Sequence, residues 1–306
     1  MTDLSLPPSA VSPPPDHSSS GGRRARSRLR WVAGAILLLL GSMAIAPGIW
    51  VAPSPAPADP HQCSIRTPDG GFQDRLPPSS EHWFGTDLQG CDYYTQVIYG
   101  ARASMTTGLL AVLIGGTIAV VLGGLAGFAG GWVDTVISRC TDVFLGIPGL
   151  VLAILLMASL AGDDRSILDV ALVLGLLGWP FALRLVRSTV LEIRSLHFVD
   201  ASRLLGVSPL RTVVRHVLPN ALAPLVGYIA LSVGGAVIAE TGLTFLGIGL
   251  QAPTISWGQM IARGQERIAD VPHLLLFPIL MLTLTVLAFF GVGELLERRL
   301  NAGSRP

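Results

Sequence analysis

Hydrophobic residues along the 306-residue chain gather in long stretches that are separated by polar connections. A helix needs about 20 mostly apolar residues to cross the roughly 30 Å of hydrocarbon in a bilayer. Two neighbouring stretches are divided only by the polar link Asp163–Arg165, but a single fused helix would be too long for one span. The pattern predicts an all-α polytopic membrane protein with six transmembrane helices, at about 31–51, 105–130, 143–161, 168–186, 220–245 and 273–293.

Composition and charge agree with this interpretation. Half of the residues are hydrophobic and only 13% are charged, which is typical of a polytopic membrane protein. The net charge of +1 gives no reason to expect a nucleic-acid partner. Arginines cluster at 23–30, 184–215 and 298–305, and the positive-inside rule predicts that all three regions face the cytoplasm. Six spans place them on one side of a bacterial inner membrane, so both termini are expected to be cytoplasmic.

The chain is expected to divide into five regions. Residues 1–22 are rich in Pro, Ser and Gly and predict a disordered tail. A Pro-rich stretch at 53–57 predicts an extended spacer at the start of the extracytoplasmic segment. The expected regions are a disordered basic tail at 1–30, a first transmembrane helix at 31–52, an extracytoplasmic segment at 53–103, a five-helix transmembrane core at 104–297 with a cytoplasmic loop at 187–219, and a cytoplasmic tail at 298–306.

Missing residue types restrict the chemistry. The chain has no lysine, so it has no phosphate-binding loop of the Gly-x-x-x-x-Gly-Lys-Ser/Thr type, and any use of ATP must come from a partner. Carboxylates lie only near the ends of the spans, whereas ion-coupled carriers usually need one at mid-membrane. We find no catalytic group, metal-ligand cluster or cofactor site in the sequence, and we expect a non-catalytic protein.

The loop from Phe198 to Asn220 is the most informative segment. It is too polar to span a bilayer, because each arginine would cost about 2.5–3.5 kcal/mol at the bilayer centre. It nevertheless keeps a helical rhythm of apolar residues, and Gly206 with Ser208–Pro209 is suited to end one helix and begin another. A short amphipathic helix of this kind can dock in a groove of a partner protein. The alternative is a solvated loop that only joins two spans.

This loop resembles the cytoplasmic "EAA" loop of binding-protein-dependent ABC import permeases. Asp200-Ala201-Ser202 stands where that family has Glu-Ala-Ala, Gly206 fits its glycine, and His216–Pro219 fits its closing His-x-Leu-Pro. In the family this segment carries the coupling helix, which sits in a cleft of the ATPase subunit. The resemblance implies an ATPase-coupling interface formed by Asp200, Ala201, Ser202, Leu205, Gly206, His216 and Pro219.

Two further blocks resemble the oligopeptide and dipeptide branch of the family. Phe84–Asp92 is similar to its Phe-Gly-Thr-Asp-x-x-Gly-Arg-Asp signature, with Cys91 in place of the arginine. Ala239–Leu250, followed by Ser256–Gly258, is similar to its Glu-Ser-x-Leu-Ser-Phe-Leu-Gly-Leu-Gly and Pro-Ser-Trp-Gly runs. With the coupling loop, the resemblance covers roughly residues 80–300. It implies a type I ABC importer permease fold and a C-type permease subunit.

The resemblance also implies the function and the partners. The expected function is import of oligopeptides or dipeptides by alternating access, with a homologous second permease, two ABC ATPases or one fused ATPase, and an extracytoplasmic binding protein or lipoprotein. ATP and Mg would be bound by the ATPases, and this chain would bind no cofactor. Three alternatives stay open: import of nickel chelates or another small solute by the same architecture, an ion-coupled secondary transporter, and a membrane-anchored scaffold.

Three residues outside the loop have two interpretations each. Cys63 and Cys91 share the oxidising extracytoplasmic segment, which predicts a disulfide, and the alternative is two unpaired thiols. Glu240, near the outer end of the fifth span, either lines the mouth of the pathway or is a structural carboxylate at a helix end.

A stripe of small residues follows the second span at intervals of four: Gly115, Ala119, Gly123, Gly127 and Gly131. Residues four apart share one helix face, and small residues there allow the backbone of another helix to approach closely. The stripe therefore predicts helix packing, and the alternative is the general enrichment of glycine in membrane helices.

Overall fold

The computed structural model describes residues 20–65, 71, 74–160, 162, 165–197, 199, 207–217, 219, 221 and 225–303. These ranges are helical apart from their connections, with two isolated β-bridges and no β-strand among them. The helices are α1 (Ser20–Ile45), α2 (Pro47–Val51), α3 (Tyr93–Ala129), α4 (Gly131–Leu145), α5 (Gly149–Leu160), α6 (Ile167–Arg194), α8 (Pro209–Thr212), the π-helical η1 (Val213–Val217), α10 (Leu225–Phe245), α11 (Trp257–Gly264), the 3₁₀-helical η2 (Gln265–Arg267) and α12 (His273–Gly303).

The predicted all-α polytopic fold is confirmed, but the count of six spans is not reproduced. Within the described ranges α3, α6, α10 and α12 are long and apolar enough to cross a membrane. The third expected span, 143–161, is not one straight helix, because α4 and α5 meet there at an angle of 93°. Pro148 in the connection lacks the N–H that would continue the ladder of α4. The apolar part of α1, Trp31–Ile45, is shorter than the other spans.

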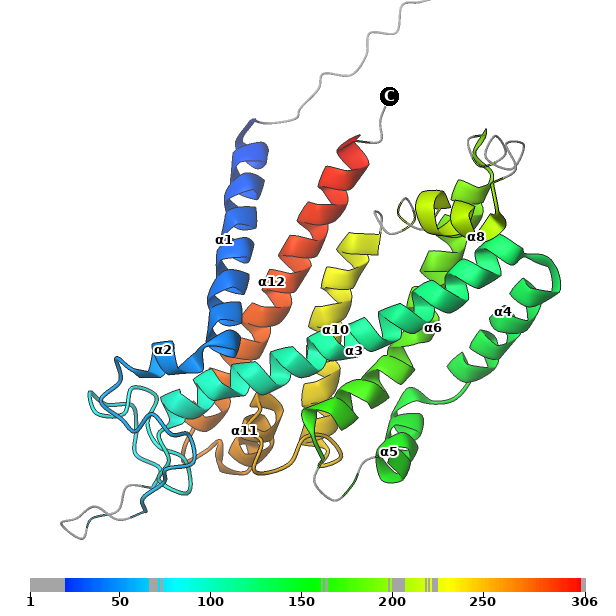
Figure 1. Cartoon of the computed structure of the whole chain (residues 1–306). Helices are drawn as coiled ribbons and strands as arrows, with labels where there is room; N and C mark the ends of the chain where they lie inside the picture. The colour runs from blue at the N-terminus through cyan, green and yellow to red at the C-terminus, as the bar shows by residue number, and fades with distance from the viewer. Residues whose placement is uncertain are drawn as a thin grey trace, which may run out of the picture.

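The long helices run side by side, with α3, α6 and α12 in one direction and α1 and α10 in the other (Figure 1). We call one end of the bundle the arginine-rich end; it carries Arg194 at the end of α6 and Arg298 near the end of α12. We call the other the disulfide end; it carries α2, the disulfide between Cys63 and Cys91, and α11 (Figure 1). Helix α3 crosses the bundle diagonally and packs mainly on α6, while α1 and α12 lie together at one side.

Three apolar clusters hold the bundle together. The first surrounds the fully buried Trp257 and joins α1, α3, α11 and α12. The second joins α3, α5, α6 and the end of α10, and the third joins the ends of α6 and α10 near Val217. Many large apolar side chains stay exposed on the long helices, such as Leu113 and Phe181. In a helix that crosses a bilayer such side chains face lipid or a partner.

Candidate functional site

The stripe of small residues brings the backbones of α3 and α6 into contact. A Cβ atom built on Gly115 would lie 2.7 Å from the carbonyl oxygen of Gly175, and one on Gly123 would lie 2.9 Å from that of Leu183. These distances exclude any side chain without a shift of the backbone. Gly127 meets α6 in the same way, and Ala119 is fully buried between them.

Gly131 does not belong to this stripe, contrary to the sequence prediction. Helix α3 ends at Ala129, and Gly130 and Gly131 both have positive φ angles, +67° and +57°. This backbone conformation favours glycine and turns the chain into α4. The interval of four continues past the last residue of α3 and therefore does not mark a common face there.

A cleft of about 1010 Å³ lies between α3, α6 and α10. Its walls come from 109–121, 174–186 and 225–239 of these helices. Twelve residue steps at 1.5 Å make the cleft about 18 Å long, more than half of the hydrocarbon thickness. The lining is almost entirely aliphatic or glycine.

Few polar groups line the cleft. The hydroxyls of Thr117 and Ser232 donate to carbonyl oxygens of their own helices, at 2.7 and 2.8 Å. Tyr228 is the third residue with a hydroxyl in the lining. Such a wall offers a polar solute few hydrogen bonds, so it is suited to passage and not to tight binding.

Next to the cleft, toward the disulfide end, lies a group that we call the Glu240 cluster: Glu240, Ser104, Thr241, Thr244 and Ser256. Glu240 has no exposed surface, and the Thr244 hydroxyl donates to its carboxylate at 2.9 Å. Thr241, Ser104 and Ser256 also hydrogen-bond to this side chain. In this conformation Glu240 therefore does not line an open pathway mouth, because the hydroxyl groups enclose it. The contacts favour the structural carboxylate of the two interpretations.

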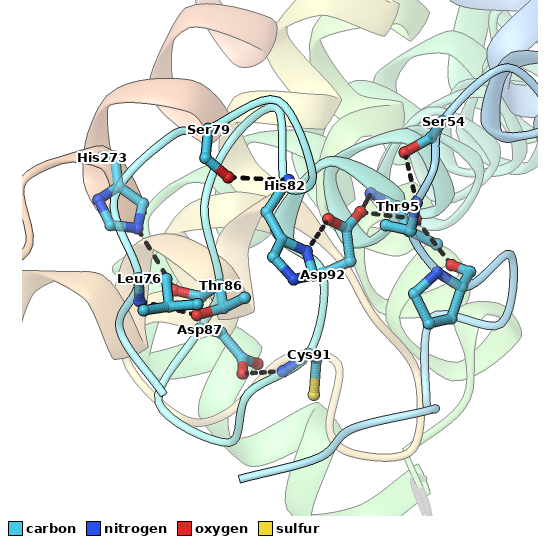
Figure 2. Close-up of polar contacts among 12 residues, drawn as sticks. Ser54, Leu76, Ser79, His82, Thr86, Asp87, Cys91, Asp92, Thr95 and His273 are labelled. Atoms are coloured by element: carbon cyan, nitrogen blue, oxygen red, sulfur yellow. Dashed lines mark hydrogen bonds and ion pairs between the residues drawn. The ribbon is translucent and has the colours of Figure 1, made fainter. Parts of the chain in front are cut away.

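The segment 84–92 forms a rigid turn ahead of α3 (Figure 2). The Asp87 carboxylate accepts hydrogen bonds from the backbone N–H groups of Gln89 and Cys91, at 2.8 and 2.9 Å. Asp92 caps α3 by accepting from the N–H of Thr95 at 2.8 Å, and its other oxygen lies 2.9 Å from Nδ1 of His82. The two aspartates of this motif thus have structural roles.

Two positions in this turn accept no residue other than glycine. Gly85 and Gly90 have φ angles of +78° and +75°, and a Cβ atom on either would lie within about 2.3 Å of a backbone carbonyl oxygen.

A disulfide joins Cys63 and Cys91, for which the sequence left open a disulfide or two free thiols. Closing a loop of this length stabilises a fold by about 3–4 kcal/mol in the chain-entropy model. Phe84 stacks on Phe277 at 3.8 Å and attaches the segment to α12.

Most of the expected coupling interface lies outside the described residues: Asp200, Ala201, Ser202, Leu205 and Gly206. His216 lies in η1, and Pro219 is exposed. The flanks of the loop are firmly packed. Val199, Val217 and Ala221 are fully buried in one cluster with Val186 and Val190 of α6. Any force on the loop would therefore act directly on the end of α6.

Two Asp–Arg pairs connect α4 to α6 beside a cavity of about 520 Å³. Arg187 contacts both carboxylate oxygens of Asp134, and Arg184 donates to Asp142 at 2.8 Å. From the sequence, these arginines are predicted only to face the cytoplasm. The missed signal was the spacing of Asp134 and Asp142, which puts both on one face of a helix. Among the described residues no group of three or more His, Cys, Asp or Glu side chains could hold a metal ion.

A helical membrane bundle with an apolar cleft and a polar loop at one end has the architecture expected of a transport permease. Residues 119–302 match the binding-protein-dependent transport system inner membrane component family. The chain belongs to this family, the permease subunits of ABC importers, and is a multi-pass membrane protein of the type I permease fold.

Relatives cover nearly the whole chain. The dipeptide transport system permease protein DppC of Alkalihalophilus pseudofirmus is 33% identical over 97% of this chain and 95% of its own length. The DppC protein of Bacillus subtilis is 38% identical over 75% and 71%. The glutathione transport system permease protein GsiD of Shigella dysenteriae is 37% identical over 73% of both chains.

A solved structure supports the fold. A chain of the MetNI methionine ABC transporter in an inward-facing conformation superposes with a TM-score of 0.56 at 20% identity. The match covers 69% of this chain and 97% of that one.

Proposed function

We propose that this chain is the C-type permease subunit of an ATP-driven importer of dipeptides or oligopeptides. The observation that carries the proposal is similarity over nearly the full length to permeases named for dipeptide transport. It includes the 84–92 turn and the Glu240 region, which the sequence resemblance assigned to the peptide branch. The cleft, with almost no hydrogen-bonding groups of its own, suits a solute that is selected elsewhere and only passes through.

The partners follow from the surfaces that this chain leaves open. The cleft has walls from three helices of one chain, and a homologous second permease would supply the opposite wall. The 187–219 loop would dock on two ABC ATPases or one fused ATPase, which bind and hydrolyse ATP with Mg. A binding protein or lipoprotein would deliver the solute at the disulfide end. The positive-inside rule supports a cytoplasmic arginine-rich end, with both termini on that side.

Alternating access follows from how the loop is attached. Closure of the ATPases would pull on the loop, and its flanks Val199 and Val217 would transmit the pull to α6 because they are buried against it. Helix α3 would move with α6, because the Gly115 and Gly123 contacts leave no space for sliding. The motion would close the cleft to one side of the membrane and open it to the other. The chain itself performs no chemical step.

Substitutions in the loop test this proposal. Asp200→Arg and Gly206→Leu are expected to abolish peptide uptake while ATP hydrolysis and membrane insertion persist, because the docking helix no longer transmits the motion. Asp200→Glu, which restores the family's residue, is the matched control and is expected to transport normally. Uptake of a labelled dipeptide into proteoliposomes, with ATPase activity measured on the same samples, gives both quantities. Normal uptake by the Arg and Leu variants would contradict the coupling role.

A further inference from the structure

Glu240 is a carboxyl group buried among hydroxyl groups from three parts of the fold. Ser104 lies on α3, Thr241 and Thr244 follow Glu240 on α10, and Ser256 is the N-cap of α11. All five side chains are less than 9% exposed. A buried carboxylate is tolerated only when donors satisfy its oxygens. Ser104, Thr244 and Ser256 can each donate one hydrogen bond, whereas the Thr241 hydroxyl also faces the Val237 carbonyl, at 3.0 Å against 3.4 Å to Glu240.

The same hydroxyls hold the backbone of the neighbouring elements. The oxygen of Ser104 accepts the backbone N–H of Trp257 at 3.2 Å, so α11 is fixed to α3. The oxygen of Thr244 accepts the N–H of Leu250 at 3.0 Å, so the connection after α10 is fixed as well. Glu240 therefore acts on α11 and on residues 246–256 through hydroxyls that bond to both.

This layer lies directly beyond the end of the cleft. The α10 lining of the cleft stops at Ala239, one residue before Glu240. Trp257 fills the bundle beyond it, with no exposed surface and its indole N–H donating to the Val97 carbonyl at 3.0 Å. A Cβ atom on Gly258 would lie 2.9 Å from that of Thr244, so α11 and α10 are in direct contact.

We propose that Glu240 is a positioning residue that holds this layer together and so keeps the cleft closed at the disulfide end. The inference rests on the proposed function. A pathway that opens at the disulfide end must separate α11 and α10 from α3, which removes hydroxyl partners from a buried carboxylate at a cost in free energy. The Glu240 cluster therefore favours the state that is closed at the disulfide end. Because coupling is reciprocal, weakening the cluster also favours the ATPase state linked to outward opening.

Thiol labelling of the complex in its native membrane measures closure directly. Ala239→Cys in a Cys140→Ser background places a thiol at the end of the cleft, and a membrane-impermeant maleimide is added from the disulfide-end side. Labelling is expected to be slow in this parent and about tenfold faster with Glu240→Leu, which corresponds to about 1.4 kcal/mol. Glu240→Gln keeps one acceptor oxygen and is expected to give an intermediate rate. Equal rates in all three would overturn the proposal.

ATP hydrolysis by the purified complex without binding protein supplies the second readout. Glu240→Leu is expected to raise this basal rate severalfold, whereas Thr285→Val, which removes a buried hydroxyl of α12 that donates to the Met281 carbonyl and not to the cluster, is expected to leave it unchanged. Faster hydrolysis without faster labelling would also contradict the closing role.

A substitution that prevents insertion does not end the test. If Glu240→Leu fails to insert, Ser104→Ala carries the same comparison, since it removes one hydroxyl from the cluster. A parent complex without peptide-dependent hydrolysis would instead contradict the proposed function, and the labelling result would still decide the role of Glu240.

Discussion

At the scale of single residues, the absence of a side chain decides how α3 and α6 pack. Gly123 and Gly124 are neighbours in the same helix, but only Gly123 faces α6. A Cβ on Gly123 would lie 2.9 Å from the Leu183 carbonyl oxygen and 3.0 Å from the Val186 Cβ, whereas one on Gly124 would meet nothing within 4 Å. The same substitution therefore has opposite expected effects at the two positions.

Gly123→Ala is expected to destabilise the protein by about 1–3 kcal/mol, because the added methyl group overpacks a backbone contact. Gly124→Ala is expected to be neutral or to stabilise by up to about 1 kcal/mol, the usual gain of alanine over glycine in a helix. The thermal unfolding of the two purified variants in one detergent gives the comparison. Equal loss of stability in both would show that the close approach of the helices does not set the packing.

At the scale of elements, α4 is attached to α6 by two ion pairs and by a contact between the rings of Phe144 and Trp179. Thr141 is its only buried side chain among those described, and Trp132 and Val143 are largely exposed. The Asp134–Arg187 pair has two contacts and partial burial of both side chains, so it is the polar contact expected to contribute most to this attachment. Two-point Arg–carboxylate pairs are stronger than single surface ion pairs.

A double-mutant cycle on Asp134→Ala and Arg187→Ala is expected to give a coupling energy of about 1 kcal/mol in unfolding experiments. The exchanged pair Asp134→Arg with Arg187→Asp is expected to recover part of the stability lost by either single reversal. Arg139→Ala is the control, since that side chain is 80% exposed and lies 3.7 Å from Asp142. A coupling energy near zero would mean that the pair does not attach α4.

The elements also show how far the sequence could be interpreted. Hydropathy located the apolar stretches, because lipid requires about 20 apolar residues whatever the tertiary structure. It missed the bend between α4 and α5, because a window average ignores the effect of one proline on the helix ladder. Hydropathy also could not show which groups surround the Glu240 side chain. Whether a carboxylate near a helix end faces a pathway or a ring of hydroxyls depends on Ser104 and Ser256, both far from it in sequence.

At the scale of the whole molecule, the chain has the architecture of one half of a larger assembly. It has a cleft walled on one side, exposed apolar helices, and a polar loop whose flanks are buried against α6. The Glu240 cluster lies next to the last α10 residue of the cleft, toward the disulfide end. These features agree with the proposal of a permease that works with a second permease, ABC ATPases and a binding protein.

The most direct test of this account is purification of the chain from its native membrane, with identification of the bound proteins and an ATPase assay with dipeptides, glutathione and a nickel chelate. We predict recovery of a second permease, an ABC ATPase and a binding protein, with hydrolysis stimulated by peptides. The same assembly stimulated only by the chelate would contradict the peptide assignment. A chain that is recovered alone and transports without ATP would contradict the importer itself.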